Sequence, residues 1–255
     1  MQELPEKMQN PHVIPGSDIA QWLTPLGLSV RLFVSSLSWT AISAIRLDEF
    51  QTFCRWMGKR SFHFVALSAV FVSIALTIQC VVELQKYRAE DISGAVIAIG
   101  LLREFGPLTV SLAWCARVSA LVSDEARSYG SSNIVDFARY FVCPRYLAAL
   151  SMAVPLGAYG LVFGFITAAV LAPLLGVSST NDFLESAKKG IQDRDLFVYF
   201  FKLILINPTI GVFAGCAAGF LARGNMSVPA AANAVTATLL AGYIANALVT
   251  FAIFL

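Results

Sequence analysis

Long apolar runs separated by short polar turns make up most of the chain from residue 61 onward. Each of the five runs is long enough to cross the roughly 30 Å of hydrocarbon in a bilayer as a helix, which takes about 20 apolar residues. The runs cover residues 61–84, 92–122, 144–175, 196–222 and 228–254. The pattern therefore predicts an all-α integral membrane protein with five transmembrane helices.

The N-terminal sixty residues have a different pattern. Residues 1–18 are polar and proline-rich and lack the apolar core of a signal peptide, so we expect a polar tail that stays attached. Residues 19–60 hold an apolar stretch that is too short to span, with Trp22 and Trp39 nearby. This favours an amphipathic helix in the membrane interface, followed by a basic connector. The five-span domain is then residues 61–255.

The composition agrees with a bilayer as the solvent. The chain has 255 residues, of which 57% are hydrophobic and 13% are charged, about half the charged fraction of a soluble domain. The net charge is +2 and no basic run occurs, which argues against nucleic-acid binding. The five cysteines form no C-x-x-C pair and the two histidines lack neighbouring ligands, so we expect neither a metal site nor a disulfide framework.

Lysine and arginine are distributed unevenly between the two sides of the predicted membrane domain. If the N-terminus is cytoplasmic, ten lie in cytoplasmic segments: Lys7, Arg31, Arg46, Arg55, Lys59, Arg60, Arg127, Arg139, Arg145 and Arg223. Five lie in outer segments: Lys86, Arg88, Lys188, Lys189 and Arg194. Because cytoplasmic loops carry the excess of positive charge, this favours a cytoplasmic N-terminus and a C-terminus on the outside.

Two charged residues, Arg103 and Glu104, lie inside the second run. Arg103 is eleven residues from Ile92, about 16 Å deep at 1.5 Å per residue, where a charge costs at least about 2.5–3.5 kcal/mol. The two side chains point about 100° apart, so they do not simply pair with each other. Pro107 cannot donate to the Arg103 carbonyl and Gly106 adds flexibility, which predicts a helix kink. A functional site and a structural ion pair with another helix both remain open.

Other polar and small residues within the runs have structural interpretations. Lys202 is expected to extend outward from the fourth run, and Arg117 to form an interfacial salt bridge beside Asp124 and Glu125. Glycines at four-residue spacing let a second helix approach closely, which predicts helix packing. These glycines are Gly160 and Gly164 in the third run, and Gly211, Gly215 and Gly219 in the fourth.

The segment Leu101-Leu102-Arg103-Glu104-Phe105-Gly106-Pro107 resembles the L-L-R-E-[LF]-G-P signature of the MlaE/YrbE permease family. Its members are the membrane subunits of MCE-linked ABC lipid transporters. Weaker similarity extends over residues 55–255, with Gln79 and Tyr87 upstream of the signature and Ala116-Arg117, Glu125 and Pro144-Arg145 downstream. The family fold is an interfacial helix followed by five spans, as the hydrophobic pattern predicts independently.

The resemblance also implies partners and site residues. It implies a second permease subunit, a cytoplasmic ABC ATPase that carries the ATP, an MCE-domain protein and a phospholipid cargo, with no cofactor in this chain. The membrane would be the bacterial inner membrane or an equivalent organelle envelope membrane. The residues implied in the lipid site are Gln79, Tyr87, Arg103 and Glu104. Those implied in ATPase coupling are Arg117, Glu125, Asp136, Arg139 and Arg145.

The coupling segment departs from the family pattern. Residues 131–139 lack the expected E-Q-[IL] motif, and this segment is several residues shorter than its counterpart in the family. One hypothesis is that the chain is the diverged half of a heteromeric permease pair. An alternative is a non-transporting membrane scaffold in the same type of complex. A membrane enzyme ranks last, because the sequence offers no paired carboxylates, metal cluster or nucleophile–base set. The chain also lacks the G-x-x-x-x-G-K-[ST] loop, so ATP hydrolysis is expected on a separate subunit.

Overall fold

The computed structural model describes residues 17–38, 47–130, 133–177, 179–223 and 229–254, and its regular structure there is helical without any strand. Five helical stretches are long and apolar enough to cross a membrane. They are Leu47–Lys86, Glu90–Ser128, Ile134–Leu174, Asp193–Leu221 and Ala230–Phe254. The prediction of an all-α membrane protein with five spanning helices is confirmed.

Most of the spans are interrupted by π-helical turns, in which one extra residue widens the helix. The first span consists of α3 (Leu47–Cys54), a π turn (Arg55–Lys59) and α4 (Phe62–Lys86). The second consists of α5 (Ser93–Gly100), a π turn (Leu101–Phe105), α6 (Gly106–Val110), a π turn (Ser111–Cys115) and α7 (Ala116–Ser128). A π turn thus lies directly before Gly106 and Pro107, the two residues at which the sequence predicts a kink.

The remaining spans follow the predicted runs closely, except that the third begins at Ile134 rather than at residue 144. The third consists of α8 (Ile134–Phe137), a π turn (Ala138–Val142) and α9 (Cys143–Leu174), and α10 (Thr180–Gly190) follows it. The fourth consists of α11 (Asp193–Phe201), a π turn (Lys202–Ile206) and α12 (Asn207–Leu221). The fifth is α13 (Ala230–Phe254).

The segment before the first predicted span differs from the single helix and connector expected over residues 19–60. It contains two helices, α1 (Ser17–Ser36) and α3, and the basic stretch at Arg55–Lys59 is helical and leads into α4. Residues 39–46, with Trp39 and Arg46, lie outside the described residues, as do residues 1–16 of the tail.

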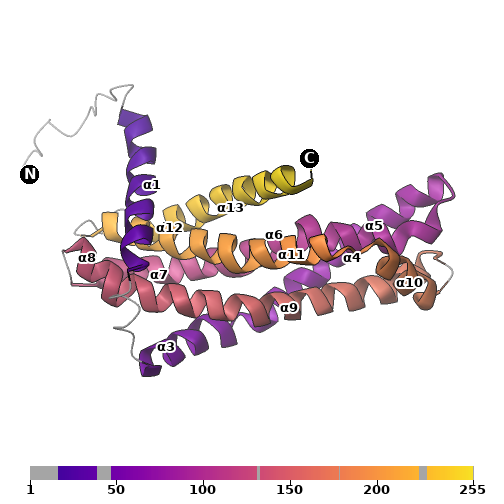
Figure 1. The fold of residues 1–255 in the computed structure, drawn as a ribbon, viewed down its shortest axis with the longest axis horizontal. Helices are drawn as coiled ribbons and strands as arrows, with labels where there is room; N and C mark the ends of the chain where they lie inside the picture. Colours follow the sequence, from indigo (N-terminus) through magenta and orange to yellow (C-terminus); the bar gives the residue numbers. More distant parts are fainter. Residues whose placement is uncertain (1–16, 39–46, 131–132, 178, 224–228, 255) are drawn as a thin grey trace, which may run out of the picture.

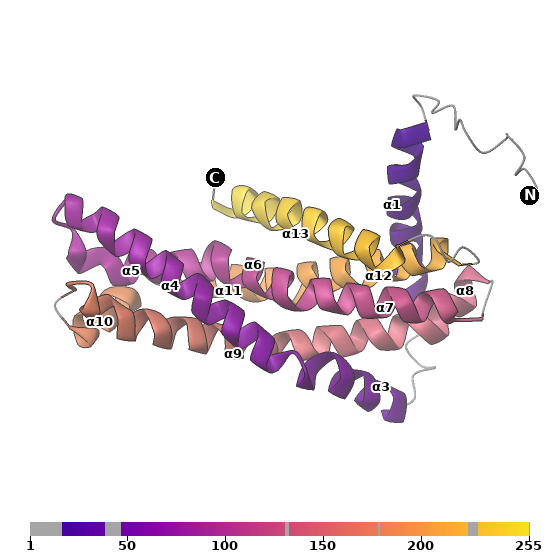
Figure 2. The same cartoon turned by 180° about the vertical axis from the view of Figure 1, so that it is seen from behind.

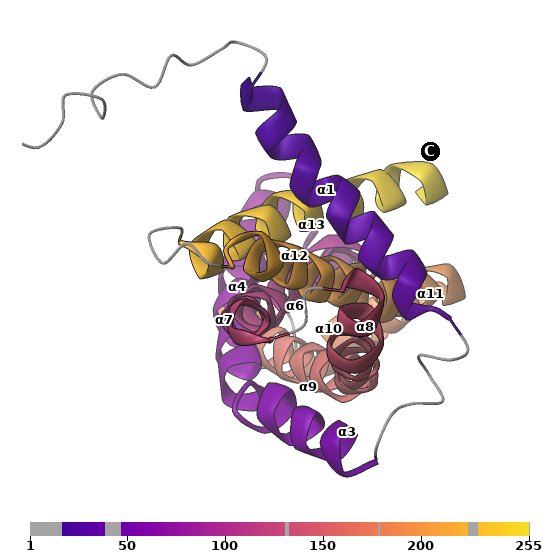
Figure 3. The same ribbon diagram turned by 90° about the vertical axis from the view of Figure 1, so that its left-hand side faces the viewer.

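The five spans lie side by side along the long axis of the molecule (Figures 1 and 2). In contrast, α1 runs across one end of this bundle, over the ends of α8 and α12 (Figure 3). Phe33 of α1 packs edge-on against Phe213 of α12, with ring centroids 5.3 Å apart. Exposed Leu26, Val30 and Val34 lie on the same helix. This orientation agrees with a helix in the plane of the membrane at the end predicted to be cytoplasmic.

At the opposite end of the bundle, α10 packs against α5 (Figure 1). The two backbones are so close that a Cβ on Gly94 would lie 2.1 Å from the carbonyl oxygen of Phe183. The turn from α4 to α5 and the helix α10 extend beyond the C-terminal end of α13 (Figures 1 and 2). The second span is therefore longer than the layer that α11 and α13 define.

The glycines singled out in the sequence all face other helices. Cβ atoms on Gly211, Gly215 and Gly219 of α12 would lie 3.2, 2.6 and 2.3 Å from backbone or Cβ atoms of Cys115, Ser119 and Ser123. Their face therefore lies directly on the α7 backbone. Gly160 of α9 faces Val65 of α4 more loosely, at 3.1 Å, and Gly164 faces Leu101 at 3.8 Å.

Candidate functional site

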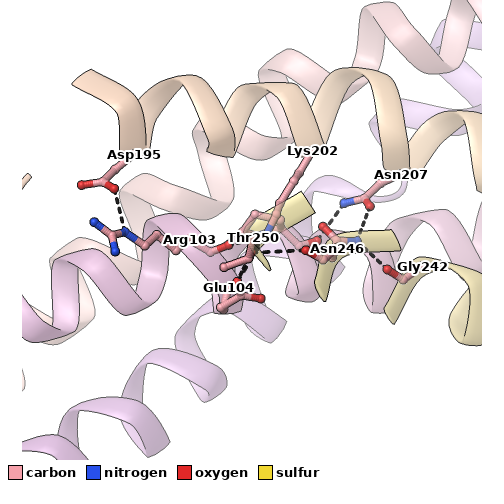
Figure 4. Close-up of polar contacts among 9 residues, drawn as sticks. Arg103, Glu104, Asp195, Lys202, Asn207, Gly242, Asn246 and Thr250 are labelled. Atoms are coloured by element: carbon pink, nitrogen blue, oxygen red, sulfur yellow. Dashed lines mark hydrogen bonds and ion pairs between the residues drawn. The ribbon is translucent and has the colours of Figure 1, made fainter. Parts of the chain in front are cut away.

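The first ion pair of the membrane domain joins Arg103 to Asp195. Arg103 Nε donates to Asp195 Oδ1 at 2.7 Å, and the Asp195 side chain is fully buried (Figure 4). The other oxygen of Asp195 accepts the backbone N–H of Gln192 at 3.0 Å as part of a capping box that begins α11. Asp195 is therefore fixed by its own helix and in turn fixes the Arg103 side chain.

The Arg103 guanidinium keeps unused donors. Both of its Nη atoms make no hydrogen bond within the described part of the chain, and the side chain is 27% exposed. Its Cζ lies 3.9 Å from the centroid of the Phe254 ring on the last turn of α13. Arg103 is thus level with the first turn of α11 and the last turn of α13. The second span extends past those two helices, so Arg103 lies near their ends although it is eleven residues from Ile92.

The second ion pair joins Glu104 to Lys202, whose side chain is fully buried. Nζ of Lys202 lies 3.2 Å from Glu104 Oε1 and also donates to the hydroxyl of Thr250 on α13. Thr250 in turn contacts Glu104 Oε1, so three spans meet at one carboxylate (Figure 4). The expectation that Lys202 extends outward was wrong, because the Glu104 carboxylate and the Arg103 carbonyl hold it inside the bundle.

The row of polar contacts between these spans, here called the polar seam, continues through asparagines toward the other end of the bundle. Asn207 donates to the carbonyl of Pro107 at 3.0 Å, and Asn246 donates to the Asn207 side chain at 2.7 Å (Figure 4). Further along, Thr238 of α13 donates to Ser119 of α7 at 2.8 Å. The α13 residues of the seam recur every fourth position: Thr238, Gly242, Asn246, Thr250 and Phe254. One face of α13 is thus polar and packed, while its other face exposes large apolar side chains.

The structure does not bring Gln79 and Tyr87 into this network. Both are exposed, Tyr87 at 78%, and they lie on α4 and at its C-terminal end. Among the described residues, no side-chain hydrogen bond or ion pair links either one to Arg103 or Glu104. Of the four residues implied in the lipid site, only Arg103 and Glu104 are therefore gathered within this single chain.

The residues implied in ATPase coupling lie at the end that α1 crosses. Arg145 Nε and Nη2 donate to Glu125 Oε2 at 2.9 and 2.5 Å, and Nη1 donates to the Phe141 carbonyl. Its guanidinium also lies over the rings of Phe141 and Phe53, at 3.6 and 4.2 Å. Arg117 does not form the salt bridge expected with Asp124 or Glu125. It donates to the Arg60 carbonyl and the Ser61 hydroxyl instead.

Beside this buried cluster, α8 presents a mixed surface. Asn133 caps α8 by accepting the N–H of Val135. Asp136 and Val135 are exposed, Tyr140 is 50% exposed, and Arg139 lies over the Tyr140 ring at 5.5 Å. Phe137 of the same turn is fully buried. The shortened segment therefore forms a capped helical turn with one outward face. Ser131 and Ser132 lie outside the described residues.

Sequence reasoning missed the partners that complete the network: Asp195, Thr250 and Phe254. One signal was present, since Asp195 and Lys202 are seven residues apart and share a helix face. Their charges complement those of Arg103 and Glu104 in the second span. Thr250 and Phe254 carried no comparable signal, because a threonine and a phenylalanine are ordinary residues in a transmembrane helix.

Comparison with known proteins places this arrangement in a family. The sequence profile of the family described as Permease MlaE matches residues 51–252. The chain belongs to the MlaE permease family. The match extends over all five spans except residues 47–50 and 253–254, and it includes every residue of the polar network apart from Phe254. The resemblance carried by the Leu101–Pro107 signature is confirmed, and the chain is a multi-pass membrane protein of a transporter family.

Curated relatives of this MlaE-family chain are described as permeases. A probable ABC transporter permease protein of Synechocystis is 26% identical over 78% of this chain and 79% of its own length. A probable ABC transporter permease protein of Porphyra purpurea is 22% identical, over 81% of each chain. The intermembrane phospholipid transport system permease protein MlaE of Haemophilus influenzae is 33% identical over 37% of this chain and 39% of its own.

Proposed function

We propose that the chain is the membrane permease subunit of an ABC transporter that moves phospholipid, or a related lipid, between membranes. The observation that supports this most directly is the Arg103 side chain. Asp195 holds its Nε, while neither Nη atom has an acceptor among the described residues and the side chain is partly exposed. A guanidinium presented in this way matches the oxygens of a phosphate group.

Glu104 belongs to the same lipid site but has a different role. Its Oε1 is occupied by Lys202 and Thr250, and the side chain is 34% exposed. The carboxylate therefore neutralises the buried Lys202 and joins α13 to the kinked second span. In this proposal Arg103 contacts the headgroup, and Glu104 holds the surrounding helices in position.

A second permease subunit would complete the lipid site. Only 17% of the apolar 18-residue stretch of α13 is buried. Exposed large side chains lie on its outer face: Leu240, Tyr243, Ile244, Leu248 and Phe251. Exposed Gln79 and Tyr87, which this chain does not join to Arg103, are available to a lipid held between two subunits. The partner is the same chain or, because residues 131–139 are altered, a more typical family member.

The remaining parts of the proposal concern partners and topology. ATP hydrolysis takes place on a separate cytoplasmic ATPase, which meets the α8 surface, and an MCE-domain protein stands on the far side. The N-terminus is cytoplasmic and the C-terminus outside, in a bacterial inner membrane or an equivalent organelle envelope membrane. The charge distribution and the position of α1 at the α8 end support this orientation.

Affinity purification from the native membrane tests the assembly. We expect an ATPase, an MCE protein and bound phospholipid to co-purify, and the intact mass of the complex distinguishes one permease species from two. In proteoliposomes of that complex, Arg103→Gln should lower ATP-dependent lipid transfer at least tenfold, with a Lys188→Gln variant as control. A chain that purifies alone and lipid-free, in a detergent that keeps other transporters intact, would support the scaffold alternative instead.

A further inference from the structure

Two arginines share one aromatic ring at the C-terminal end of α13. The Cζ of Arg103 lies 3.9 Å from the centroid of Phe254, and the Cζ of Arg194 lies 4.8 Å from the same centroid. Guanidinium groups at such distances are attracted to the face of an aromatic ring. The ring therefore keeps the two guanidinium groups within 8.7 Å of each other.

The two guanidinium groups differ in whether a carboxylate is paired with them. Arg103 is neutralised by Asp195, whose two oxygens are occupied by Arg103 Nε and the N–H of Gln192. Arg194 is exposed and makes no ion pair within the described residues. The neighbouring Asp193 lies in the first turn of α11, where the helix dipole already favours a negative charge. Arg194 is thus the cation available to a ligand.

The location suits the headgroup of a membrane lipid. The site is formed by the first turn of α11 and the last turn of α13, at the outer ends of two spans. Arginine and aromatic side chains at such ends lie at the level of lipid headgroups. A bound phosphate would meet the free Nη atoms of Arg103 first, and any further group on the headgroup would meet Arg194.

We propose that Arg194 and Phe254 make the site selective for phospholipids whose headgroup carries a net negative charge. This inference rests on the proposed function, because it assigns the class of lipid to the site at Arg103. The zwitterionic headgroup of phosphatidylcholine carries an ammonium group, which Arg194 repels, whereas the anionic headgroup of phosphatidylglycerol has no such group. Selectivity arises from this repulsion as well as from attraction to the anion.

The test uses the whole complex, reconstituted in vesicles of equal phosphatidylglycerol and phosphatidylcholine and then re-purified for quantification of bound lipid. We expect the wild type to retain more phosphatidylglycerol than phosphatidylcholine. Arg194→Gln should lower the ratio of the two bound lipids at least fivefold, and Arg194→Lys should lower it less. Phe254→Leu should lower it as well, because Arg194 loses its contact with the ring.

Lys188→Gln is the matched control, since it removes one exposed positive charge from α10 at the same end of the molecule. Its lipid ratio should equal that of the wild type, and an equal fall in both variants would overturn the inference by pointing to general surface charge. An unchanged ratio in Arg194→Gln overturns the inference and leaves the proposed function intact. A wild-type complex that retains no lipid overturns both.

Discussion

The Nζ of Lys202 lies 2.6 Å from the backbone carbonyl oxygen of Arg103 and donates a hydrogen bond to it. In a regular α-helix this carbonyl would accept the N–H of the residue four positions later, which is Pro107 and has none. A side chain from the fourth span therefore takes the place of a missing backbone donor in the second. Lys202 supplies the donor that Pro107 lacks, and the Arg103 carbonyl supplies an acceptor for the buried lysine.

The Lys202→Met variant should destabilise the protein. It leaves the Glu104 carboxylate and the Arg103 carbonyl without this donor in a low-dielectric setting. We expect a loss of about 3 kcal/mol, the low end for a broken buried pair, because Glu104 is one-third exposed. Thermal unfolding in detergent measures the change. Adding Glu104→Gln to Lys202→Met should recover part of the loss, whereas additive losses would show that the two side chains are not coupled.

The Gly219→Ala variant tests the contact between α7 and α12. The new Cβ would lie 2.3 Å from the Ser123 carbonyl oxygen, so the two helices must separate. We expect a loss of about 1–3 kcal/mol, as for other overpacked cores, measured as a fall in melting temperature. Gly164→Ala is the matched control, because its Cβ would meet nothing closer than 3.8 Å. Similar melting temperatures for the two variants would contradict the described contact.

The spans and the family could be predicted from the sequence, because runs of apolar residues and a short motif indicate them directly. The five spans follow from runs of apolar residues, and the bounds of α4 and α13 agree closely with the predicted 61–84 and 228–254 because the bilayer constrains helix length directly. The Leu101–Pro107 signature identified the family. By contrast, the level of Arg103 relative to the ends of α11 and α13 could not be predicted, since the length of one helix does not reveal where its neighbours end.

Side-chain partners were harder to predict than spans. Lys202 was expected to extend outward because it is an isolated lysine within an apolar run, and snorkelling is the usual outcome there. Only the packing of the second span against the fourth brings it to Glu104, and the sequence of one span does not reveal that packing. Arg117 likewise bonds to the carbonyl of Arg60 across helices rather than to the acidic residues that follow it in sequence.

The Arg145→Lys variant should cost more stability than Glu125→Gln, although only the second change removes a charge from the ion pair. The arginine fork makes three hydrogen bonds and stacks on Phe141 and Phe53, and a lysine reproduces neither feature. We expect a loss of about 2 kcal/mol for Arg145→Lys and about 1 kcal/mol for Glu125→Gln, whose side chain is 37% exposed. Chemical unfolding ranks the two, and the reverse order would show that the charge pair outweighs the packing.

Two variants in the turn formed by α8 and the following π-helix can separate the proposed contact with an ATPase from folding. Tyr140 is 50% exposed, whereas Phe137 is fully buried against Tyr129, Phe141 and Phe220. If α8 meets the ATPase, Tyr140→Ala should leave the melting temperature within about 1 °C of the wild type. The same variant should lower lipid-stimulated ATP hydrolysis of the complex about threefold or more. Phe137→Ala should instead unfold the region, with a loss of about 3–5 kcal/mol.

Both measurements are needed to interpret this pair of variants. Reduced hydrolysis in Tyr140→Ala with an unchanged melting temperature and unchanged co-purification of the MCE protein would place the ATPase at the α8 surface. Full hydrolysis in that variant, and in one that also carries Asp136→Lys, would mean that the shortened segment does not contact an ATPase. The coupling surface would then belong to a partner permease with the typical segment, and this chain would be the diverged half of a heteromeric pair.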